Sequence, residues 1–414
     1  MRVSLGYGRS TLDVEVPDKN HKAILLPEEV EGVADEDAEI RRALLNPIGT
    51  KRLAEIAEGK RNAVIIVSDI TRPVPSAKLL PPLLDELEEG GLGEEEITIV
   101  FALGSHRKHT EEEKRELVGD RIFERVRCID HDLNDCIPVG RTSAGTPVEI
   151  FRPVAEADLI VCTGAIEVHY FAGYTGGLKA ILPGVSSMRT IEENHRMLLR
   201  EDARAGRIDG PIRRDIDEAG KMLGVDFILN VILNSKKEIV KVVGGDPVKA
   251  HREGVKVVDR MFKVPAQVSD IVIASAGGFP KDLNLYQAHK ALENAGNAVK
   301  DGGTLILIAE CRESFAHSEF EQWITEADVP GKLLERLRRE FRIGGHKAAS
   351  LARLLERFDV LLVSEMDEED VKRAFMVPVS SVEEALRLAL ERHGENASIT
   401  VIPYSGSTLP VVGE

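Results

Sequence analysis

Hydrophobic residues in this chain gather in short continuous runs, separated by longer stretches in which apolar positions recur at helical spacing. The runs rich in Val, Ile and Leu are predicted strands, at residues 63–67, 97–102, 159–162, 227–233, 271–274, 305–309, 360–363 and 399–402. Continuous apolar runs are typical of strands that are covered on both faces, because a strand with one face in water alternates apolar and polar residues. The pattern therefore predicts an α/β protein in which mainly parallel sheets are flanked by helices.

Two domains are expected from the chain length and from one segment. A chain of 414 residues exceeds what a single core usually supports. Residues 244–267 have the pattern of a turn, a helix and an exit, and the strand–helix rhythm that follows is typical of a Rossmann-like domain. We predict an N-terminal α/β domain at residues 1–265 and a C-terminal Rossmann-like domain at residues 266–414, with a tail, SGSTLPVVGE, that could return to the first domain.

The charge balance narrows the classes of partner. Lys and Arg number 54 against 70 Asp and Glu, a formal net charge of −16, whereas general nucleic-acid binding requires a basic face. No apolar run approaches the ~18 residues of a membrane span, and the N-terminus MRVSLGYGRS lacks the apolar stretch of a signal peptide. The four cysteines form no CxxC pair, so neither structural zinc nor a disulfide framework is predicted. We expect a cytoplasmic enzyme that binds neither nucleic acid nor membrane.

Polar clusters follow the predicted strands, where ligands of open α/β sheets bind. After the first run, SDITRPVP contains Asp69, which we expect to orient the guanidinium of Arg72 toward a carboxylate or phosphate. After the second run, His106 lies on a loop before a helix that begins at a capping box of Thr110 and Glu113. A loop histidine is suited to general base catalysis, because its pKa of about 6.5 lies near working pH. Taken singly, each of these residues also fits a plain surface role.

A glycine-rich segment contains several candidate functional side chains close together in sequence. It contains His169, Lys179 and His195, with Gly176 and Gly177 just before the lysine. Its GYTGGLKA stretch lacks the GxxxxGK[ST] spacing and the magnesium-binding hydroxyl of a nucleoside triphosphatase loop. The glycine N–H groups could still bind one phosphate, and Lys179 could bond covalently to the bound group.

A second capping box is predicted beside His195. Thr190 and Glu193 have the required spacing, which places His195 in the first turns of a helix. An imidazole on such a rigid element suits zinc, copper, iron or nickel. The plain alternative is a histidine on a helix surface.

The second half of the chain contributes one cluster. Tyr286, Gln287 and Lys290 follow the predicted strand at 271–274, and Gln287 and Lys290 share a helix face. Lys290 could bring a positive charge to a substrate carboxylate. The plain alternative is an amphipathic helix with a solvated lysine.

Five motifs together resemble one family, the nickel-dependent lactate racemases and their relatives that act on other 2-hydroxy acids. They are D-x-T-R-P-V-P from Asp69, G-x-H-R from Gly104, H-Y-F-A-G-Y-T-G-G-x-K-A-I-L-P-G from His169, N-H at 194–195, and G-G-F-P-K-D-x-N-L-Y-Q-x-x-K from Gly277. The intervals of 10 residues from His169 to Lys179 and of 16 residues from Lys179 to His195 are also similar to those of the family.

The resemblance implies a cofactor, a pyridinium mononucleotide whose carbon and two sulfur atoms hold nickel as a pincer. It implies that Lys179 is bonded to this nickel-pincer nucleotide through a thioamide, and that His195 is a nickel ligand. Gly176 and Gly177 are expected at the cofactor phosphate. The N-terminal domain would then bind the cofactor, and the C-terminal domain would contribute substrate-binding residues.

The resemblance also implies the reaction. We expect racemisation or C2 epimerisation of a 2-hydroxy acid, such as lactate, by reversible hydride transfer from the substrate Cα to the cofactor. His106 and His169 match the acid–base pair of the family. The residues that match its substrate-binding groups are Arg72 (held by Asp69) and Lys290, with Gln287 and Tyr286 nearby. Expected partners are the small substrate and the enzymes that make the cofactor, and a homodimer is one expected assembly.

Two other hypotheses stay open. The chain could be a zinc- or manganese-dependent hydrolase that uses His106, His169 and His195, although it lacks an HExxH motif. It could also be a non-catalytic carrier of nickel or of the nucleotide. A carrier would need Lys179 and His195 but would tolerate the loss of His106 and His169.

Overall fold

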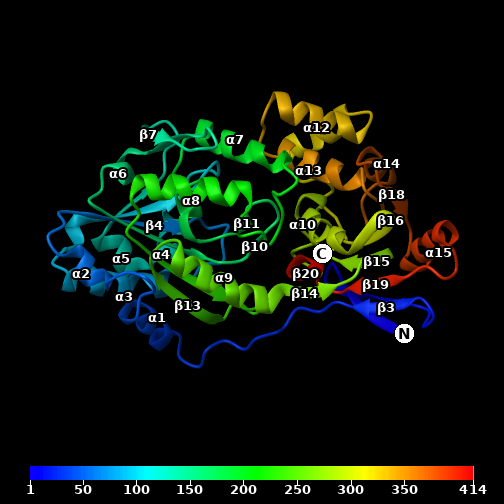
Figure 1. The fold of residues 1–414 in the computed structure, drawn as a ribbon, viewed down its shortest axis with the longest axis horizontal. Helices are drawn as coiled ribbons and strands as arrows, with labels where there is room; N and C mark the ends of the chain where they lie inside the picture. The colour runs from blue at the N-terminus through cyan, green and yellow to red at the C-terminus, as the bar shows by residue number, and fades with distance from the viewer. Residues whose placement is uncertain (414) are drawn as a thin grey trace. The chain divides into compact units, whose positions relative to one another are not determined.

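The computed structural model describes residues 1–413, which form two compact units (Figure 1). One unit is Glu29–Met261, called the 29–261 unit below. The other combines Met1–Glu28 with residues 262–413 and is called the split unit. Each unit is an α/β structure built on its own six-stranded sheet, in agreement with the hydrophobic pattern.

The sheet of the 29–261 unit has the strand order β13-β12-β9-β4-β5-β6 and is parallel except between β12 and β13. Its strands are β4 (Ala63–Ser68), β5 (Ile97–Ala102), β6 (Arg127–Asp130), β9 (Leu159–Ala165), β12 (Phe227–Leu233) and β13 (Ile239–Gly245). Its helices are α1 (Glu36–Leu45), α2 (Leu53–Ala57), α3 (Ser76–Glu89), α4 (Glu111–Val118), α5 (Asp120–Arg125), α6 (Arg152–Ala155), α7 (Met188–Arg196), α8 (Pro211–Leu223) and α9 (Lys249–Phe262), with short 3-10 turns η1 (Glu94–Glu96), η2 (Gly177–Ala180) and η3 (Met197–Leu199). All residues of β9 and β12 are buried, which explains why both strands are almost entirely apolar.

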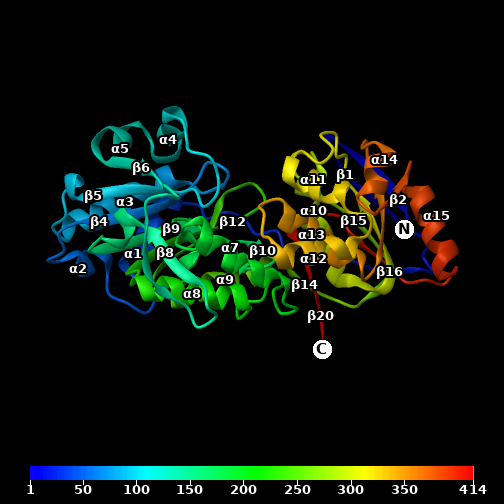
Figure 2. The same cartoon turned by 90° about the horizontal axis from the view of Figure 1, so that it is seen from above.

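The sheet of the split unit is parallel throughout, with the order β18-β17-β16-β15-β19-β3. Its strands are β3 (His21–Ile24), β15 (Ser269–Ser275), β16 (Val299–Ile308), β17 (Asp359–Val363), β18 (Val377–Val379) and β19 (Ile399–Ile402). Its helices are α10 (Leu285–Ala295), α11 (Ser318–Glu326), α12 (Pro330–Arg339), α13 (Gly345–Leu355), α14 (Glu368–Arg373) and α15 (Val382–His393), with 3-10 turns η4 (Gly296–Ala298) and η5 (Ser405–Ser407). Helix α10 packs against β15, and α11, α12 and α13 gather beside it (Figure 2).

Four small pairs of strands complete the fold. They are β1 (Arg2–Tyr7) with β2 (Ser10–Glu15), β7 (Cys136–Arg141) with β8 (Pro147–Phe151), β10 (Val168–His169) with β11 (Gly173–Tyr174), and β14 (Lys263–Ala266) with β20 (Leu409–Val412). All eight predicted strands are confirmed, whereas none of these shorter strands was predicted from the pattern. Their outward faces are polar or their length is only a few residues, so they carry no continuous apolar run.

The first residues of the chain belong to a different unit from the one expected. The expected N-terminal domain began at residue 1, but β3 pairs with β19, and Leu5 and Val14 pack into the core of the split unit. The buried side-chain amide of Asn20 donates hydrogen bonds to the carbonyl oxygens of Glu395 and Ala397, at 2.7 and 2.9 Å. The tail also stays in the split unit, where β20 pairs with β14 instead of returning to the other unit. The sequence of a four-residue edge strand does not indicate which strand it pairs with. The pairing of β3 with β19 could therefore not be predicted from the sequence.

Candidate active site

The candidate residues of the 29–261 unit lie at the carboxyl ends of its central strands. Asp69 follows β4, His106 follows β5, and the β10–β11 hairpin that carries His169 follows β9. Strands β4 and β5 are in register up to Ser68 and Ala102, so both loops leave the sheet at the same level. This placement matches the edge at which open α/β sheets bind ligands.

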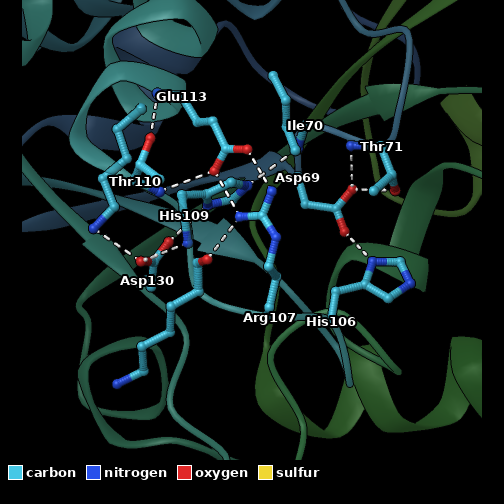
Figure 3. A network of polar contacts seen from close by, with 11 residues as sticks. Asp69, Ile70, Thr71, His106, Arg107, His109, Thr110, Glu113 and Asp130 are labelled. Carbon is cyan, nitrogen blue, oxygen red and sulfur yellow. Dashed lines mark hydrogen bonds and ion pairs between the residues drawn. The ribbon is translucent and has the colours of Figure 1, made fainter.

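Asp69 and His106 form the best-defined pair of the site (Figure 3). The Nδ1 of His106 bonds to one carboxylate oxygen of Asp69, and Thr71 donates to the other from its N–H (2.9 Å) and its hydroxyl (2.6 Å). Burial opposes ionisation of Asp69, but these hydrogen bonds and the charge of Arg72 leave its pKa below the ordinary value. Asp69 is 4% exposed and the His106 side chain 43% exposed. An ionised Asp69 therefore holds the Nδ1 proton of His106 and leaves Nε2 as the reactive nitrogen.

The expected pairing of Asp69 with Arg72 is wrong. The backbone N–H of Arg72 donates to the carbonyl of Asp69 at 3.0 Å, but the Asp69 carboxylate is occupied by His106 and Thr71. Across residues 1–413 no carboxylate forms an ion pair with the exposed guanidinium of Arg72. Its charge nevertheless acts on Lys179, whose pKa it lowers.

Two glycines shape the backbone that carries the lysine. In residues 174–179, called the lysine loop, Gly176 and Gly177 have φ of +72° and +58°, a region that disfavours side chains. A Cβ on Gly177 would lie 2.8 Å from the ring of His251, and one on Gly176 would lie 2.8 Å from Ile166. Both positions therefore require glycine for conformation and for space.

Three buried polar side chains hold the lysine loop. The Oδ1 of Asn230, in β12, accepts the N–H of Gly177 at 2.6 Å, and the Nε2 of His251, in α9, donates to the carbonyl of Thr175 at 2.8 Å. Arg213, in α8, donates to the carbonyls of Tyr174 and of Gly176 and pairs with Asp217 at 3.6 Å. Since each of the three comes from a different element, the loop is fixed from several sides.

Burial favours the neutral form of the Lys179 amine. The dense surroundings of its amine lower its pKa well below the ordinary value, and the charges of Arg72 and Arg213 lower it further. The residue is still half-buried and accessible. A neutral, accessible amine is a nucleophile, as required for a covalent bond to a bound group.

His195 occupies the end of its helix, in contrast to the prediction. Helix α7 (Met188–Arg196) is capped by Ser187, whose hydroxyl accepts the N–H of Thr190 at 3.2 Å. The Thr190 hydroxyl accepts the N–H of Glu149, and Glu193 pairs with Arg196 at 2.6 Å, so they form no capping box. His195 therefore lies in the last turn instead of the first. The box of Thr110 and Glu113 at α4 is confirmed.

An aromatic ring connects the two histidines of this region. The ring of Phe171 meets that of His169 at 4.5 Å and that of His195 at 5.0 Å, both edge to face. Burial lowers the pKa of His195 to about 3. His195 is therefore a neutral imidazole with a nitrogen lone pair, the form that binds metals.

The substrate-binding candidates of the second half gather at the start of α10 in the split unit. Asn284 caps this helix by accepting the N–H of Gln287 at 3.0 Å, and Lys290 donates to the side-chain oxygen of Gln287 at 3.1 Å. The ring of Tyr286 stacks on that of His317 at 4.8 Å. The predicted helix face of Gln287 and Lys290 is therefore confirmed.

Some site residues were missed at the level of sequence. Arg213 and His251 lie in ordinary amphipathic helices and give no signal. Asn230 did give one, because it interrupts the apolar run FILNVIL of a fully buried strand. A polar residue at such a position needs a hydrogen-bond partner, which here is the lysine loop.

The described part of the chain contains no group of three His, Cys, Asp or Glu side chains placed to hold a metal ion. His106, His169 and His195 are thus not a ligand triad. This finding disfavours the hydrolase hypothesis, which requires such a triad. In residues 1–413, moreover, no helix is long and apolar enough to cross a membrane.

The fold is α/β, and the candidate site combines an amine with histidines at the carboxyl edge of one sheet. Residues 7–206 match the model of the lactate racemase N-terminal domain, and residues 264–409 match that of the lactate racemase C-terminal domain. Lactate racemase of Thermoanaerobacterium thermosaccharolyticum is 38% identical over 421 residues, covering 98% of each chain. Lactate racemase of Lactiplantibacillus plantarum is 33% identical over 414 residues, covering 97% of each. The chain therefore belongs to the lactate racemase family, and it is a racemase, an isomerase.

Solved structures agree with this assignment. The lactate racemase apoprotein from Thermoanaerobacterium thermosaccharolyticum superposes with a TM-score of 0.92 at 36% identity and full coverage of both chains. A protein from Thermotoga maritima superposes with a TM-score of 0.64 at 19% identity, covering 93% of this chain and 100% of its own. The second likeness concerns the fold alone.

Gly177→Ala should destabilise the protein more than an alanine at a comparable glycine. Both Gly177 and Gly224 have positive φ, but a Cβ on Gly224 meets nothing within 4 Å. The left-handed backbone should cost about 1–2 kcal/mol in each variant, and overlap with His251 should add about 1–3 kcal/mol at Gly177. Thermal unfolding of the two variants measures the difference. Equal losses would contradict a tight contact between the loop and His251.

The acid side of the stability profile should depend on His251. Burial, then the charge of Arg213, lowers its pKa to about 3 in the folded protein, against about 6.5 when unfolded. Below about pH 6.5 His251 binds a proton in the unfolded chain but not in the folded chain. The free energy of unfolding therefore falls by about 1.4 kcal/mol per pH unit until about pH 3. In His251→Gln this contribution should disappear, which calorimetry between pH 7 and pH 4 would measure. Above pH 7 the variant should differ from wild type by a constant amount, and an unchanged slope below pH 6 would contradict the assignment.

Proposed function

We propose that this racemase interconverts the enantiomers of lactate or of a related 2-hydroxy acid, using a nickel-pincer nucleotide bonded to Lys179. The observation that carries the proposal is the amine of Lys179, with its lowered pKa, on a glycine loop held by Asn230, His251 and Arg213, in the same unit as the neutral imidazole of His195 and the Asp69–His106 pair. The identity of the relatives as lactate racemases supports the substrate class.

The residues of the 29–261 unit fit such a cofactor. Lys179 would provide the amine for a thioamide, and His195 would provide one nitrogen ligand to nickel. Gly176 and Gly177 keep their expected place at the cofactor phosphate, although the N–H of Gly177 is donated to the Oδ1 of Asn230 at 2.6 Å. Beside them, the buried Nδ2 of Asn230 has no hydrogen-bond partner among the described residues, so a donor remains for a bound group. The bound nucleotide would supply reversible hydride acceptance from the substrate Cα.

The protein's own part in the reaction would be proton transfer. His106, with Nδ1 held by Asp69, would take the hydroxyl proton of the substrate on Nε2. His169 keeps the second acid–base role that its motif suggests; its Nδ1 accepts the N–H of Ala172 at 3.3 Å, so a neutral ring carries its proton on Nε2 in this state. The two histidines would serve one enantiomer each, as racemisation requires a base for either hand of the substrate.

The substrate carboxylate would be bound by cations. We assign this role to Arg72, whose exposed guanidinium suits two-point contact with a carboxylate. A substrate-binding role stays assigned to Lys290, Gln287 and Tyr286, as their motif suggests. The role of Asp69 changes, because its carboxylate holds His106 and does not hold Arg72. The enzymes that make the nucleotide would have to supply it to this protein, which we expect to act in the cytoplasm. Assembly into a homodimer stays a prediction.

A carrier function is less consistent with the site. A carrier requires Lys179 and His195. A carrier function does not explain why a carboxylate holds the Nδ1 of an accessible histidine. That arrangement at Asp69 and His106 is typical of a histidine prepared for proton transfer.

Lys179→Ala should abolish the covalent cofactor. When the protein is co-expressed with the enzymes that make the nucleotide, wild type should gain a mononucleotide-sized mass and bound nickel, because the amine forms the bond. The variant should lack the added mass. Intact-mass spectrometry and nickel analysis measure both, and an adduct on the variant, or none on wild type, would overturn the proposal.

His106→Ala and His169→Ala should keep the adduct but lose racemisation, since each removes a proton acceptor. The loss in kcat/KM should be at least about 100-fold. Because the equilibrium constant of a racemisation is one, kcat/KM must fall equally in both directions, and asymmetry between the enantiomers should appear in kcat and KM separately. Rates near wild type in a loaded variant would contradict the acid–base assignment.

A further inference from the structure

One buried histidine outside the proposed reaction joins the two loops that carry Asp69 and His106. His109 lies on the His106 loop, and its Nε2 accepts the N–H of Ile70, the residue after Asp69, at 3.1 Å (Figure 3). Its Nδ1 bonds to the carboxylate of Asp130, at the end of β6, at 2.7 Å. The loops after β4 and β5 are thus connected twice, once through His106 and once through His109.

The partners of His109 determine its protonation. Asp130 accepts, so Nδ1 must carry a proton, and the amide of Ile70 donates, so Nε2 must not. A neutral imidazole with its proton on Nδ1 satisfies both contacts, whereas a second proton on Nε2 would oppose the Ile70 N–H. Both ring nitrogens are used, so His109 is not available as a metal ligand.

The surroundings of His109 hold this arrangement in place. Its side chain is 1% exposed, and its ring packs edge to face on Phe101 at 5.2 Å. Asp130 is in turn fixed by the ammonium of Lys114 at 2.9 Å and by the backbone N–H of His109 at 3.3 Å. The acceptor for Ile70 is therefore attached to two strands of the sheet.

We propose that His109 is a positioning residue: by accepting the Ile70 N–H it fixes the backbone beside Asp69, so that the Asp69 carboxylate holds the Nδ1 proton of His106. Its effect on catalysis rests on the proposed function, because it assumes that His106 moves the substrate proton. The effect of His109 on the His106 ring does not depend on the proposed function, and it can be measured on the apoprotein.

The test compares two amides that imitate different nitrogens of the ring. In His109→Gln the side-chain oxygen can reach the place of Nε2 and accept from Ile70, whereas in His109→Asn the shorter amide reaches only toward Asp130. Ring nitrogen shifts of His106, from NMR of histidine-labelled apoprotein, report whether Nδ1 or Nε2 carries the proton. A His106→Gln sample assigns the signals, and Asp69→Asn shows the shifts of His106 without its carboxylate.

Thr110→Ala is the matched control for general loosening. It removes the cap of α4 on the same loop, where the Thr110 hydroxyl accepts the N–H of Glu113, and leaves the acceptor of the Ile70 N–H in place. It should lower the melting temperature and leave the His106 shifts unchanged. His109→Asn should move those shifts toward the Asp69→Asn values, and His109→Gln should restore them.

In loaded enzyme, kcat/KM should fall roughly tenfold in His109→Asn and stay within about twofold of wild type in His109→Gln, as expected for one positioned hydrogen bond. Wild-type His106 shifts in His109→Asn, or equal changes in both amide variants, would overturn the positioning role. Altered shifts in a protein that does not racemise would support the positioning role and reject the proposed function instead.

Discussion

The site depends on the cost of burying a short backbone turn between strand β11 and the 3-10 turn η2. The lysine loop turns through two positive-φ glycines, so most of its N–H and carbonyl groups lie outside a sheet or a long helix. Left without partners, each buried group would cost about 1–3 kcal/mol. Asn230, His251 and Arg213 supply the missing hydrogen bonds from three elements. The same dense packing partly buries Lys179 and lowers the pKa of its amine, so one constraint acts on both the shape of the loop and the charge of the lysine.

Arg213 has opposite effects on the stability of the fold and on the reactivity of Lys179. A fully buried guanidinium is expensive to desolvate, and Asp217 at 3.6 Å with two loop carbonyls compensates for it. A neutral side chain of similar shape would remove that cost. It would also remove a positive charge that helps to lower the pKa of Lys179. A buried cation is therefore understandable as a property of the reactive site, and not as a contribution to stability.

Sequence predicted what depends on local pattern and missed what depends on tertiary pairing. The continuous apolar runs gave eight of the twelve strands in the two large sheets, and the glycine–lysine motif indicated the loop that carries Lys179. The partner of Asp69 was missed because proximity along the chain favoured Arg72, three residues away, over His106. The in-register ends of β4 and β5 bring His106 to Asp69 across 37 residues of sequence. Recognising that adjacent parallel strands end together would have suggested this pair. The β3–β19 pairing offered no comparable signal.

The position of His195 illustrates how tertiary context selects between equivalent local signals. Ser187 and Thr190 both carry a hydroxyl suited to capping, but the N–H of Glu149 occupies Thr190, so Ser187 begins the helix. The consequence is electrostatic as well as geometric. The first turn of a helix carries partial positive charge and the last turn partial negative charge, equivalent to about half an elementary charge each. A cation bound to His195 would thus lie near the favourable end of α7, whereas the predicted position in the first turns would have opposed it.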